Sequence, residues 1–329
     1  MAKQYYQVIL KKLANIYKMF LNKPEFWNNS HVSIWSILLF PFSIVYLLIS
    51  KLNKIKSSKK FKVPIVCVGN IYLGGTGKTP LALEIYDIYK SLGKNPGFVK
   101  KYYDYLEDEI KMLKKKGEVY FSKNRSEAID KLINSNKDIA ILDDGFQDFT
   151  IKKNFSIICF NEKQWLGNRM LIPSGPLREK LSSITRADCI FINGRKNKKI
   201  EEEIYYYNKE IKIYYSKYKP LKIEEFKNKK IIAFAGIGNP SNFFNLLEEN
   251  NLNLLNKFTF PDHYNYKTKD LNKLISDAEE SGSILLTTEK DYFRIIEEYK
   301  KKIKYIKVEI EIERKEDFVN LMKKTYEKN

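Results

Sequence analysis

The sequence is poor in the residues that bind metals and form disulfides. Its 329 residues include three cysteines, Cys67, Cys159 and Cys189, and two histidines, His31 and His263. No cluster of these residues has metal-ligand spacing, so a zinc module is not expected. Each cysteine lies in an apolar, strand-like run far from the others, which predicts buried, unpaired thiols in a reducing compartment. Catalysis by histidine has very few candidates.

Acidic residues are also few relative to basic ones. Lysine and arginine number 59 against 40 aspartates and glutamates, a formal net charge of +19. Such an excess suits nucleic acid, an anionic membrane or a phosphorylated substrate. Lys, Asn, Ile and Tyr are abundant along the whole chain, however, so a compositional bias could supply much of the charge. The hydrophobic fraction of 43% is that of a globular protein, and the length allows two domains.

One long uncharged hydrophobic run stands out, near the N-terminus. Residues 32–50 carry no charge, and their length is close to the roughly 20 residues that cross a bilayer. Pro41 would kink a spanning helix, so a helix lying in one leaflet fits as well as a span. The run begins too late for a cleaved signal peptide, and no small-residue cleavage pattern follows it. The alternative is a buried core helix, which Ser33, Ser36 and Ser43 favour.

The flanks of this run are basic. Residues 1–30 have the spacing of a basic, partly amphipathic helix that ends at Lys23-Pro24. Five lysines follow the run, at positions 51, 54, 56, 59 and 60. Lysines beside an apolar helix are attracted to anionic lipid by about 1 kcal/mol each. We therefore expect residues 1–60 to form a membrane-associated N-terminal part.

A glycine-rich stretch from Leu73 to Pro80 follows the apolar run Pro64–Val68 and precedes a helical pattern over 81–92. In this order, glycines let backbone N–H groups converge on phosphate, a lysine reaches the terminal phosphates and a threonine hydroxyl faces Mg²⁺. These residues are Gly74, Gly75, Thr76, Gly77, Lys78 and Thr79. The first glycine of the full pattern is replaced by Tyr72. The stretch predicts a nucleotide site.

Strand and helix patterns alternate from Lys62 onward. The apolar runs at 63–68, 139–142, 155–160 and 189–193 predict a parallel sheet with helices on both faces. A second unit follows, with strands at 231–234 and 284–287 and helices around 242–249 and 268–280. We expect domains at 61–215 and 216–329, connected through a possible two-stranded ribbon of 211–223 with 303–312.

Three acidic or histidine-containing segments carry candidate chemistry. Asp143 and Asp144 end an apolar strand, where such a carboxylate commonly holds Mg²⁺ in nucleotide sites. Asp108 and Glu109 lie in a segment whose local pattern alone favours the acidic start of a helix. His263 follows Pro261-Asp262, where a turn and a general base are both open.

Together, these segments resemble the tetraacyldisaccharide 4′-kinase family of lipid A biosynthesis. The resemblance covers nearly the whole chain and rests on a combination of motifs: Pro24–Trp27, Val68–Asn70 with Gly74–Pro80, Asp108-Glu109, Leu142–Gln147, Gly175–Glu179, Ala235–Pro240, Phe260–His263 and Thr287–Asp291. The phosphate loop of that family also lacks the first glycine.

The resemblance implies a P-loop NTPase-like fold, a cytoplasmic, inner-membrane-associated monomer and transfer of the ATP γ-phosphoryl group to the 4′ hydroxyl of an acylated disaccharide 1-phosphate. It implies no nucleic-acid partner. By position, the catalytic pair is Asp108 and His263. Nucleotide contacts are Gly74, Gly75, Thr76, Gly77, Lys78, Thr79, Gln147 and Arg178. Mg²⁺ ligands are Thr79, Asp143 or Asp144, and Glu179. Substrate contacts are Lys101 and Tyr103.

The chain departs from the family pattern in two places. Asp148 stands where the family usually has histidine, and Lys100-Lys101-Tyr102-Tyr103 replaces Ser-Arg-Gly-Tyr. Lys101 keeps a positive charge but loses the two-pronged geometry of arginine.

Three other functions are open from the sequence. A membrane-attached regulatory ATPase shares the double glycine, but such proteins carry a lysine where this chain has Leu73. A GTPase would need Asn-Lys-x-Asp, and Lys290 lies one place too late for that motif. A nucleic-acid-binding module is suggested by the net charge alone.

Overall fold

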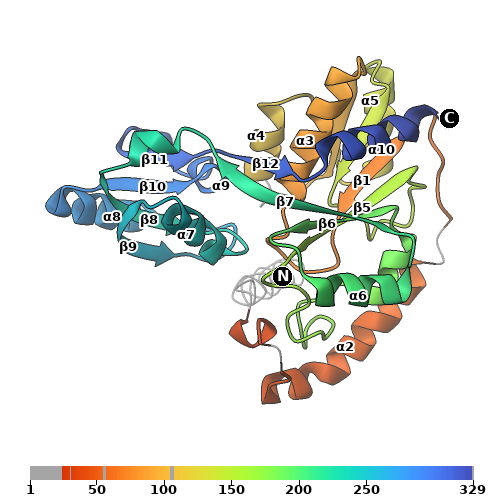
Figure 1. Ribbon diagram of the computed structural model, residues 1–329, viewed down its shortest axis with the longest axis horizontal. Helices are drawn as coiled ribbons and strands as arrows, with labels where there is room; N and C mark the ends of the chain where they lie inside the picture. Colours follow the sequence, from red (N-terminus) through yellow and green to blue (C-terminus); the bar gives the residue numbers. More distant parts are fainter. Residues whose placement is uncertain (1–23, 30, 55–56, 104–106, 328–329) are drawn as a thin grey trace, which may run out of the picture.

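The computed structural model describes residues 24–29, 31–54, 57–103 and 107–327. Two sheets, each flanked by helices, form two lobes connected by a pair of strands (Figure 1). Helix α2 (Ile34–Asn53) lies along the outer edge of the larger lobe. The predicted α/β fold, with a mostly parallel sheet, a smaller α/β unit and an N-terminal apolar helix, is confirmed.

The larger sheet has eight strands in the order β12-β7-β6-β5-β1-β4-β2-β3. All neighbouring pairs are parallel except β12 with β7. The strands are β1 (Ile65–Gly69), β2 (Pro96–Lys101), β3 (Val119–Ser122), β4 (Ile139–Asp143), β5 (Phe155–Asn161), β6 (Cys189–Asn193), β7 (Lys212–Pro220) and β12 (Val308–Ile312). The central strands β1, β4, β5 and β6 are buried throughout, which explains their near-continuous apolar sequences.

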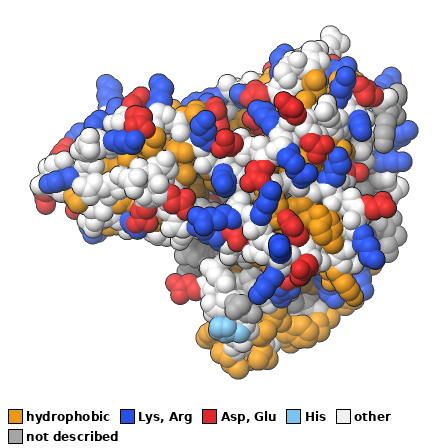
Figure 2. Space-filling view, viewed as in Figure 1, with side chains coloured by type: hydrophobic (Ala, Val, Ile, Leu, Met, Phe, Trp, Pro, Cys, Tyr) orange, Lys and Arg blue, Asp and Glu red, His pale blue; other side chains and the backbone are white. Residues whose placement is uncertain are grey.

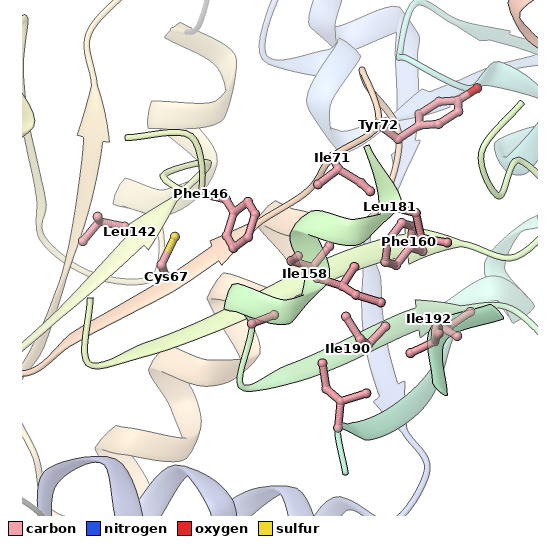
Figure 3. Close-up of a cluster of buried hydrophobic side chains, with 14 of the residues drawn as sticks. Cys67, Ile71, Tyr72, Leu142, Phe146, Ile158, Phe160, Leu181, Ile190 and Ile192 are labelled. Carbon is pink, nitrogen blue, oxygen red and sulfur yellow. The ribbon is translucent and has the colours of Figure 1, made fainter. Parts of the chain in front are cut away.

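Helices cover both faces of this sheet. One face holds α3 (Lys78–Ser91), α4 (Glu107–Lys114) and α10 (Lys315–Glu327), and the other holds α5 (Arg125–Asn134), α6 (Lys198–Tyr207) and the 3₁₀ helix η3 (Leu181–Arg186). Figure 3 shows the apolar cluster on the second face, where Cys67, Leu142, Ile158 and Ile190 project from four adjacent strands. All three cysteines are buried and unpaired, as predicted.

The smaller sheet has four parallel strands in the order β11-β10-β8-β9. They are β8 (Lys230–Ala235), β9 (Asn253–Thr259), β10 (Ile284–Thr288) and β11 (Ile303–Ile306). Helices α7 (Pro240–Glu249) and α8 (Thr268–Ser281) cover its two faces. The short helix α9 (Glu289–Tyr292) follows β10 and packs beside α4 of the larger lobe. The remaining 3₁₀ helices are η1 (Glu25–Trp27), η4 (Ile223–Phe226) and η5 (Glu297–Lys302).

The connection between the lobes corrects two expectations. Strands β7 and β12 pair antiparallel from Pro220 opposite Val308 to Ser216 opposite Ile312, but Ile303–Ile306 joins the smaller sheet instead of this ribbon. The smaller unit also ends before residue 329. Strand β12 and helix α10 return to the larger lobe, because Phe318 and Met322 complete the apolar core beside α3.

Helix α2 reverses the usual amphipathic arrangement. Its most buried side chains are Ser36 and Ser43, seven residues apart on one face. Oγ of Ser43 donates to the carbonyl of Leu171 at 2.9 Å, and Nδ2 of Asn168 donates to Oγ of Ser36 at 3.0 Å. The serines therefore fix the helix to the larger lobe through hydrogen bonds.

Large apolar side chains cover the opposite face of α2, each with 46–66% of its surface exposed: Ile34, Trp35, Ile37, Leu38, Phe40, Phe42, Ile44, Val45, Leu48, Ile49 and Leu52. Figure 2 shows them as a hydrophobic area along the lower edge of the molecule. The stretch Ile34–Leu52 is long and apolar enough to cross a membrane, and the helix runs through Pro41. The alternative of a buried core helix is wrong, because the apolar side chains face outward. The helix predicted over residues 1–30 falls largely outside the described residues.

Candidate active site

The glycine-rich stretch forms a tight loop between β1 and α3. Gly74, Gly75 and Gly77 have φ angles of +83°, +51° and +88°, in the region that favours glycine. Gly77 is the N-cap residue of α3, so Lys78 and Thr79 begin the helix. The N–H groups of a helix start attract anions. The loop therefore has the geometry that phosphate binding requires.

Tyr72 stands where the full phosphate-loop pattern has its first glycine. Its side chain is completely buried (Figure 3), and its backbone bridges to Leu177. Nδ2 of Asn70 donates both to the carbonyl of Tyr72 and, at 3.0 Å, to Oγ1 of Thr76. The buried side chain of Tyr72 and the hydrogen bonds from Asn70 thus hold the start of the loop in place.

Thr79 and Asp143 meet beside the loop. Oγ1 of Thr79 donates to Oδ2 of Asp143 at 3.0 Å. Asp143 is completely buried at the end of β4, and its Oδ1 accepts no hydrogen bond from the described residues. Mg²⁺ prefers oxygen ligands and commonly takes one or two from protein, with phosphate and water supplying the rest. A threonine hydroxyl and a buried carboxylate oxygen beside a phosphate loop fit such an ion.

Phosphate oxygens of a bound nucleotide would have to complete the coordination of the Mg²⁺ ion. Over residues 24–29, 31–54, 57–103 and 107–327, no group of three or more His, Cys, Asp and Glu could hold a metal. Thr79 and Asp143 would share the ion with phosphate and water.

Asp144, the next residue, faces the opposite way, into the cleft. NH1 of Arg178 donates to its Oδ1 at 2.7 Å and to Oε1 of Gln147 at 3.4 Å, while Nζ of Lys78 lies 4.0 Å from its Oδ2. Burial opposes its ionisation, but the charges of Arg178 and Lys78 outweigh burial and hold the pKa of Asp144 below its ordinary value. Through this carboxylate, Arg178 is thus linked to Lys78 of the phosphate loop, and Gln147 is linked to Arg178.

Glu179, predicted as a metal ligand, lies between two cations. Its buried carboxylate lies 2.9 Å from Nζ of Lys54 and 2.6 Å from NH2 of Arg186, and Nε2 of Gln147 donates to it at 3.3 Å. It is not among the residues that line the cleft. Two cations already balance its charge, so its position supports a link from the end of α2 to the loop that carries Arg178. The metal role of Glu179 stays a prediction.

A cleft of about 2810 Å³ lies between the lobes. It is lined by residues 73–80 of the phosphate loop and by Lys101, Tyr103, Asp108, Asp144, Gln147, Arg178 and His263, among others. The lobes touch at the loop itself, where a Cβ added to Gly238 would lie 2.9 Å from the backbone nitrogen of Gly75. Glycine at 238 therefore lets the smaller lobe pack directly on the phosphate loop.

Asp108, on α4 of the larger lobe, faces the smaller lobe across this cleft. Its Oδ2 lies 3.3 Å from Nδ1 of His263, 3.3 Å from Nε of Arg294 and 4.0 Å from Nζ of Lys290. Burial would raise the pKa of Asp108, but the close contact with His263 and the charge of Lys290 lower it overall. Asp108 is therefore a carboxylate at neutral pH.

The contacts of His263 define where its proton lies. Nζ of Lys290 is 3.2 Å from Nε2 of the imidazole. Burial alone would neutralise Lys290, but Glu109, Asp262 and Asp108 raise its pKa, so it stays an ammonium. An ammonium can only donate, so Nε2 accepts and a neutral ring carries its proton on Nδ1, facing Asp108.

The backbone of His263 lies in a turn, with φ of +57°. Its N–H donates to the carbonyl of Gly236 at 3.1 Å and contacts Oδ1 of Asp262 at 3.0 Å. The segment is therefore a turn, and this turn places the ring beside Asp108.

Comparison with known proteins decides the family. The family model described as LpxK, tetraacyldisaccharide-1-P 4′-kinase, matches residues 35–327. A tetraacyldisaccharide 4′-kinase of Pelagibacter ubique is 40% identical over 317 residues, covering 94% of this chain and 100% of that protein. The chain belongs to the tetraacyldisaccharide 4′-kinase family. A second kinase of this name, from Rickettsia typhi, is 34% identical over 291 residues, which are 82% of this chain and 88% of that protein.

A solved structure supports the fold. The LpxK protein of Aquifex aeolicus, in a crystal structure with ATP, is 24% identical and superposes with a TM-score of 0.68, covering 88% of this chain and 99% of that one. At this identity the likeness shows that the tetraacyldisaccharide 4′-kinase fold is shared.

The two departures from the tetraacyldisaccharide 4′-kinase pattern have local explanations. Nζ of Lys101 lies 5.3 Å from the ring centroid of Tyr103, so the two side chains form one cationic and aromatic surface on the cleft. Asp148 accepts from Arg125 at 3.1 Å and from Thr150 at 2.6 Å, which holds its own loop in place.

Sequence reasoning gave no site role to four charged residues of this kinase site: Lys100, Glu109, Lys290 and Arg294. Lys100 and Glu109 pair at 2.6 Å, and Lys290 lies 3.0 Å from the other oxygen of Glu109. A lysine directly after Phe98-Val99, inside an otherwise buried strand, is the signal that could have revealed Lys100. The contacts of Lys290 with Asp108 and Glu109 could not be found this way, because these carboxylates lie on the other lobe.

Proposed function

We propose that this family member transfers the γ-phosphoryl group of ATP to the 4′ hydroxyl of a tetraacylated glucosamine disaccharide 1-phosphate. The observation that carries the proposal is the cleft itself, in which the phosphate loop and the Asp108–His263 pair face one space. A donor site and a proton acceptor in one cleft are what transfer to an alcohol requires. The names of the relatives supply the acceptor.

The phosphate loop is the ATP half of this site. Gly74 to Thr79, with Lys78 at the terminal phosphates, bind the nucleotide, and Arg178 and Gln147 extend the contacts from Asp144. Thr79 and Asp143 would hold Mg²⁺, consistent with the buried Oδ1 of Asp143. Bound Mg²⁺ would neutralise charge on the phosphate oxygens.

Asp108 is the proposed proton acceptor. Nε2 of His263 faces Lys290, and Nδ1 lies 3.3 Å from Oδ2 of Asp108, so the ring orients this carboxylate rather than accepting the proton directly. The lowered pKa of Asp108 makes it a weak base. A weak base is suited to phosphoryl transfer with a loose transition state, since the attacking hydroxyl needs its proton removed only late.

Helix α2 is proposed to bring the enzyme to its lipid substrate at the cytoplasmic face of the inner membrane. Its outward apolar side chains suit acyl chains, and the lysines after it suit anionic headgroups. Lys101 and Tyr103, on the same cleft as the phosphate loop, would contact the sugar or its phosphate. Because one chain supplies both halves of the site, we propose that it acts as a monomer. We propose no nucleic-acid partner.

The test is incubation of the purified chain with ATP, Mg²⁺ and tetraacyldisaccharide 1-phosphate in detergent. We expect a product with one added phosphate, which NMR should locate at the 4′ position. ATP hydrolysis with nucleotide-dependent dimerisation and an unmodified acceptor would instead indicate a regulatory ATPase. Binding to anionic vesicles but not to DNA at physiological salt would separate this function from nucleic-acid binding.

A further inference from the structure

Lys100 is a buried cation between two carboxylates. It is the second-to-last residue of β2, and its side chain is 2% exposed. Its Nζ is 2.6 Å from Oδ2 of Asp143 and 2.6 Å from Oε2 of Glu109. Burial opposes its charge, but the two carboxylates raise its pKa, so it stays an ammonium. An unpaired buried ammonium would be costly, and both partners here are close enough to compensate.

The two partners belong to different halves of the site. Asp143 accepts from Thr79 on the proposed metal side. Glu109 directly follows Asp108, and its Oε1 lies 3.0 Å from Nζ of Lys290, which contacts His263. A continuous series of contacts, each 3.2 Å or shorter, therefore runs from the phosphate loop to the smaller lobe: Thr79, Asp143, Lys100, Glu109, Lys290 and His263.

Lys100 also determines which oxygens of its partners are free. On Asp143, Lys100 and Thr79 both engage Oδ2, and Oδ1 is left without a hydrogen bond from the described residues. On Glu109, Lys100 engages Oε2 and leaves Oε1 to Lys290. One ammonium thus fixes the rotation of both carboxylates.

We propose that Lys100 is a positioning residue for phosphoryl transfer, which orients Asp143 toward the metal and holds Glu109, with the adjacent Asp108, toward the smaller lobe. This role rests on the proposed function. Without Lys100, the buried Asp143 and the partly buried Glu109 would be two neighbouring anions that repel each other. Their geometry would change although neither residue had been replaced.

The test compares Lys100→Met with Glu109→Gln, the double variant and the wild-type chain. The control is Lys137→Met, because Lys137 is also a buried lysine, 8% exposed and paired with Glu118, but does not line the cleft. The kcat for transfer to the disaccharide is measured per nucleotide-binding site, so that unfolded protein is not counted. KM for ATP is measured in the same assays.

We expect Lys100→Met to lower kcat about 10- to 100-fold, the usual cost of losing a residue that orients a ligand. KM for ATP should change by less than about threefold, since the phosphate loop is untouched. Glu109→Gln should have a similar effect, and the double variant should be no worse than the more impaired single variant, because both changes break one connection. Lys137→Met should keep the wild-type kcat.

A wild-type kcat for Lys100→Met, or losses that multiply in the double variant, would overturn the positioning role. The proposed function would still stand, because the wild-type chain transfers phosphate in the same assay. If Lys100→Met does not fold, Glu109→Gln decides alone: it breaks the connection at its other end, and an unchanged kcat would refute the proposal.

Discussion

The two halves of the site are built in different ways. The phosphate half comes from one continuous segment, Leu73–Pro80, with Asp143 at the end of the neighbouring strand β4 and Asp144 directly after it. The base half is composite, with Asp108 on α4 of the larger lobe and His263, Lys290 and Arg294 on the smaller lobe. The first half can form within one lobe. The second exists only while the lobes are together, so we expect substitutions in the two halves to separate nucleotide binding from transfer.

Lys78→Met should give the largest effect, because it damages the phosphate half directly. We expect kcat/KM to fall about 1000-fold or more, since this charge acts on bound phosphates and on the transition state. Isothermal titration with ATP should show weakened binding as well. Lys90→Met, an exposed lysine in the last turn of the same helix, is the control. Unchanged ATP affinity in Lys78→Met would contradict the assignment of this half.

Gly238→Val tests the contact between the halves. Its added side chain would meet the nitrogen of Gly75 and prevent the smaller lobe from docking on the phosphate loop. We expect kcat to fall about 10- to 100-fold, because a displacement of about 1 Å is enough for such a loss. Ser241→Ala, in the first turn of the following helix α7, should behave as wild type in the same kinetic assay. Equal rates for the two variants would show that this docking does not matter.

Phe42→Glu tests whether α2 delivers the site to lipid. Phe42 is 62% exposed on the apolar face of the helix. We expect binding to anionic vesicles, measured by co-sedimentation, to weaken about tenfold or more, because a large apolar group worth about 1.5–3 kcal/mol is lost and a charge is added. Leu255→Glu, at an exposed apolar residue of the smaller lobe, is the control. Equal binding by both variants would place the membrane surface elsewhere.

Glu109→Gln should also change stability in acid, the smallest effect expected here. Burial raises the pKa of Glu109, but Lys100 and Lys290 outweigh it and hold the pKa well below its ordinary value. This stabilisation is therefore complete above the unfolded pKa, about 4.3, and is lost as pH falls through the folded value. The unfolding temperature of the wild-type chain should fall below about pH 4.5, and that of Glu109→Gln should fall less steeply. Identical acid profiles would mean that Glu109 is not stabilised by its two lysines.

The sequence predicted the continuous half better than the composite half. Leu73–Pro80 is recognisable because residues that are consecutive in the sequence form one loop in the fold. Asp143 and Asp144 are recognisable because they directly end an apolar run. The parallel sheet followed from apolar strands separated by helices. His263 and Asp108 were paired through resemblance, since 155 positions in the sequence separate them and no local pattern connects them.

Some features depended on tertiary contacts that composition does not encode. The serines of α2 suggested a helix buried in the core, but they bind the carbonyl of Leu171 and the side chain of Asn168, which are distant in sequence. Glu179 matches a metal ligand by position, but the sequence does not show that Lys54 and Arg186 lie beside its carboxylate. The return of α10 to the larger lobe depends on apolar positions whose partners lie more than 200 residues earlier.

The central claim is that Asp108 and His263, from different lobes, act as one unit on the acceptor and not on ATP. The most direct measurement is kcat and ATP affinity for Asp108→Asn, His263→Ala and the double variant, with exposed Glu107→Gln as control. We predict that Asp108→Asn lowers kcat about 100- to 10,000-fold with ATP affinity within about twofold of wild type. The double variant should lose no more than Asp108→Asn alone. Wild-type turnover in Asp108→Asn, or losses that multiply in the double variant, would contradict this account.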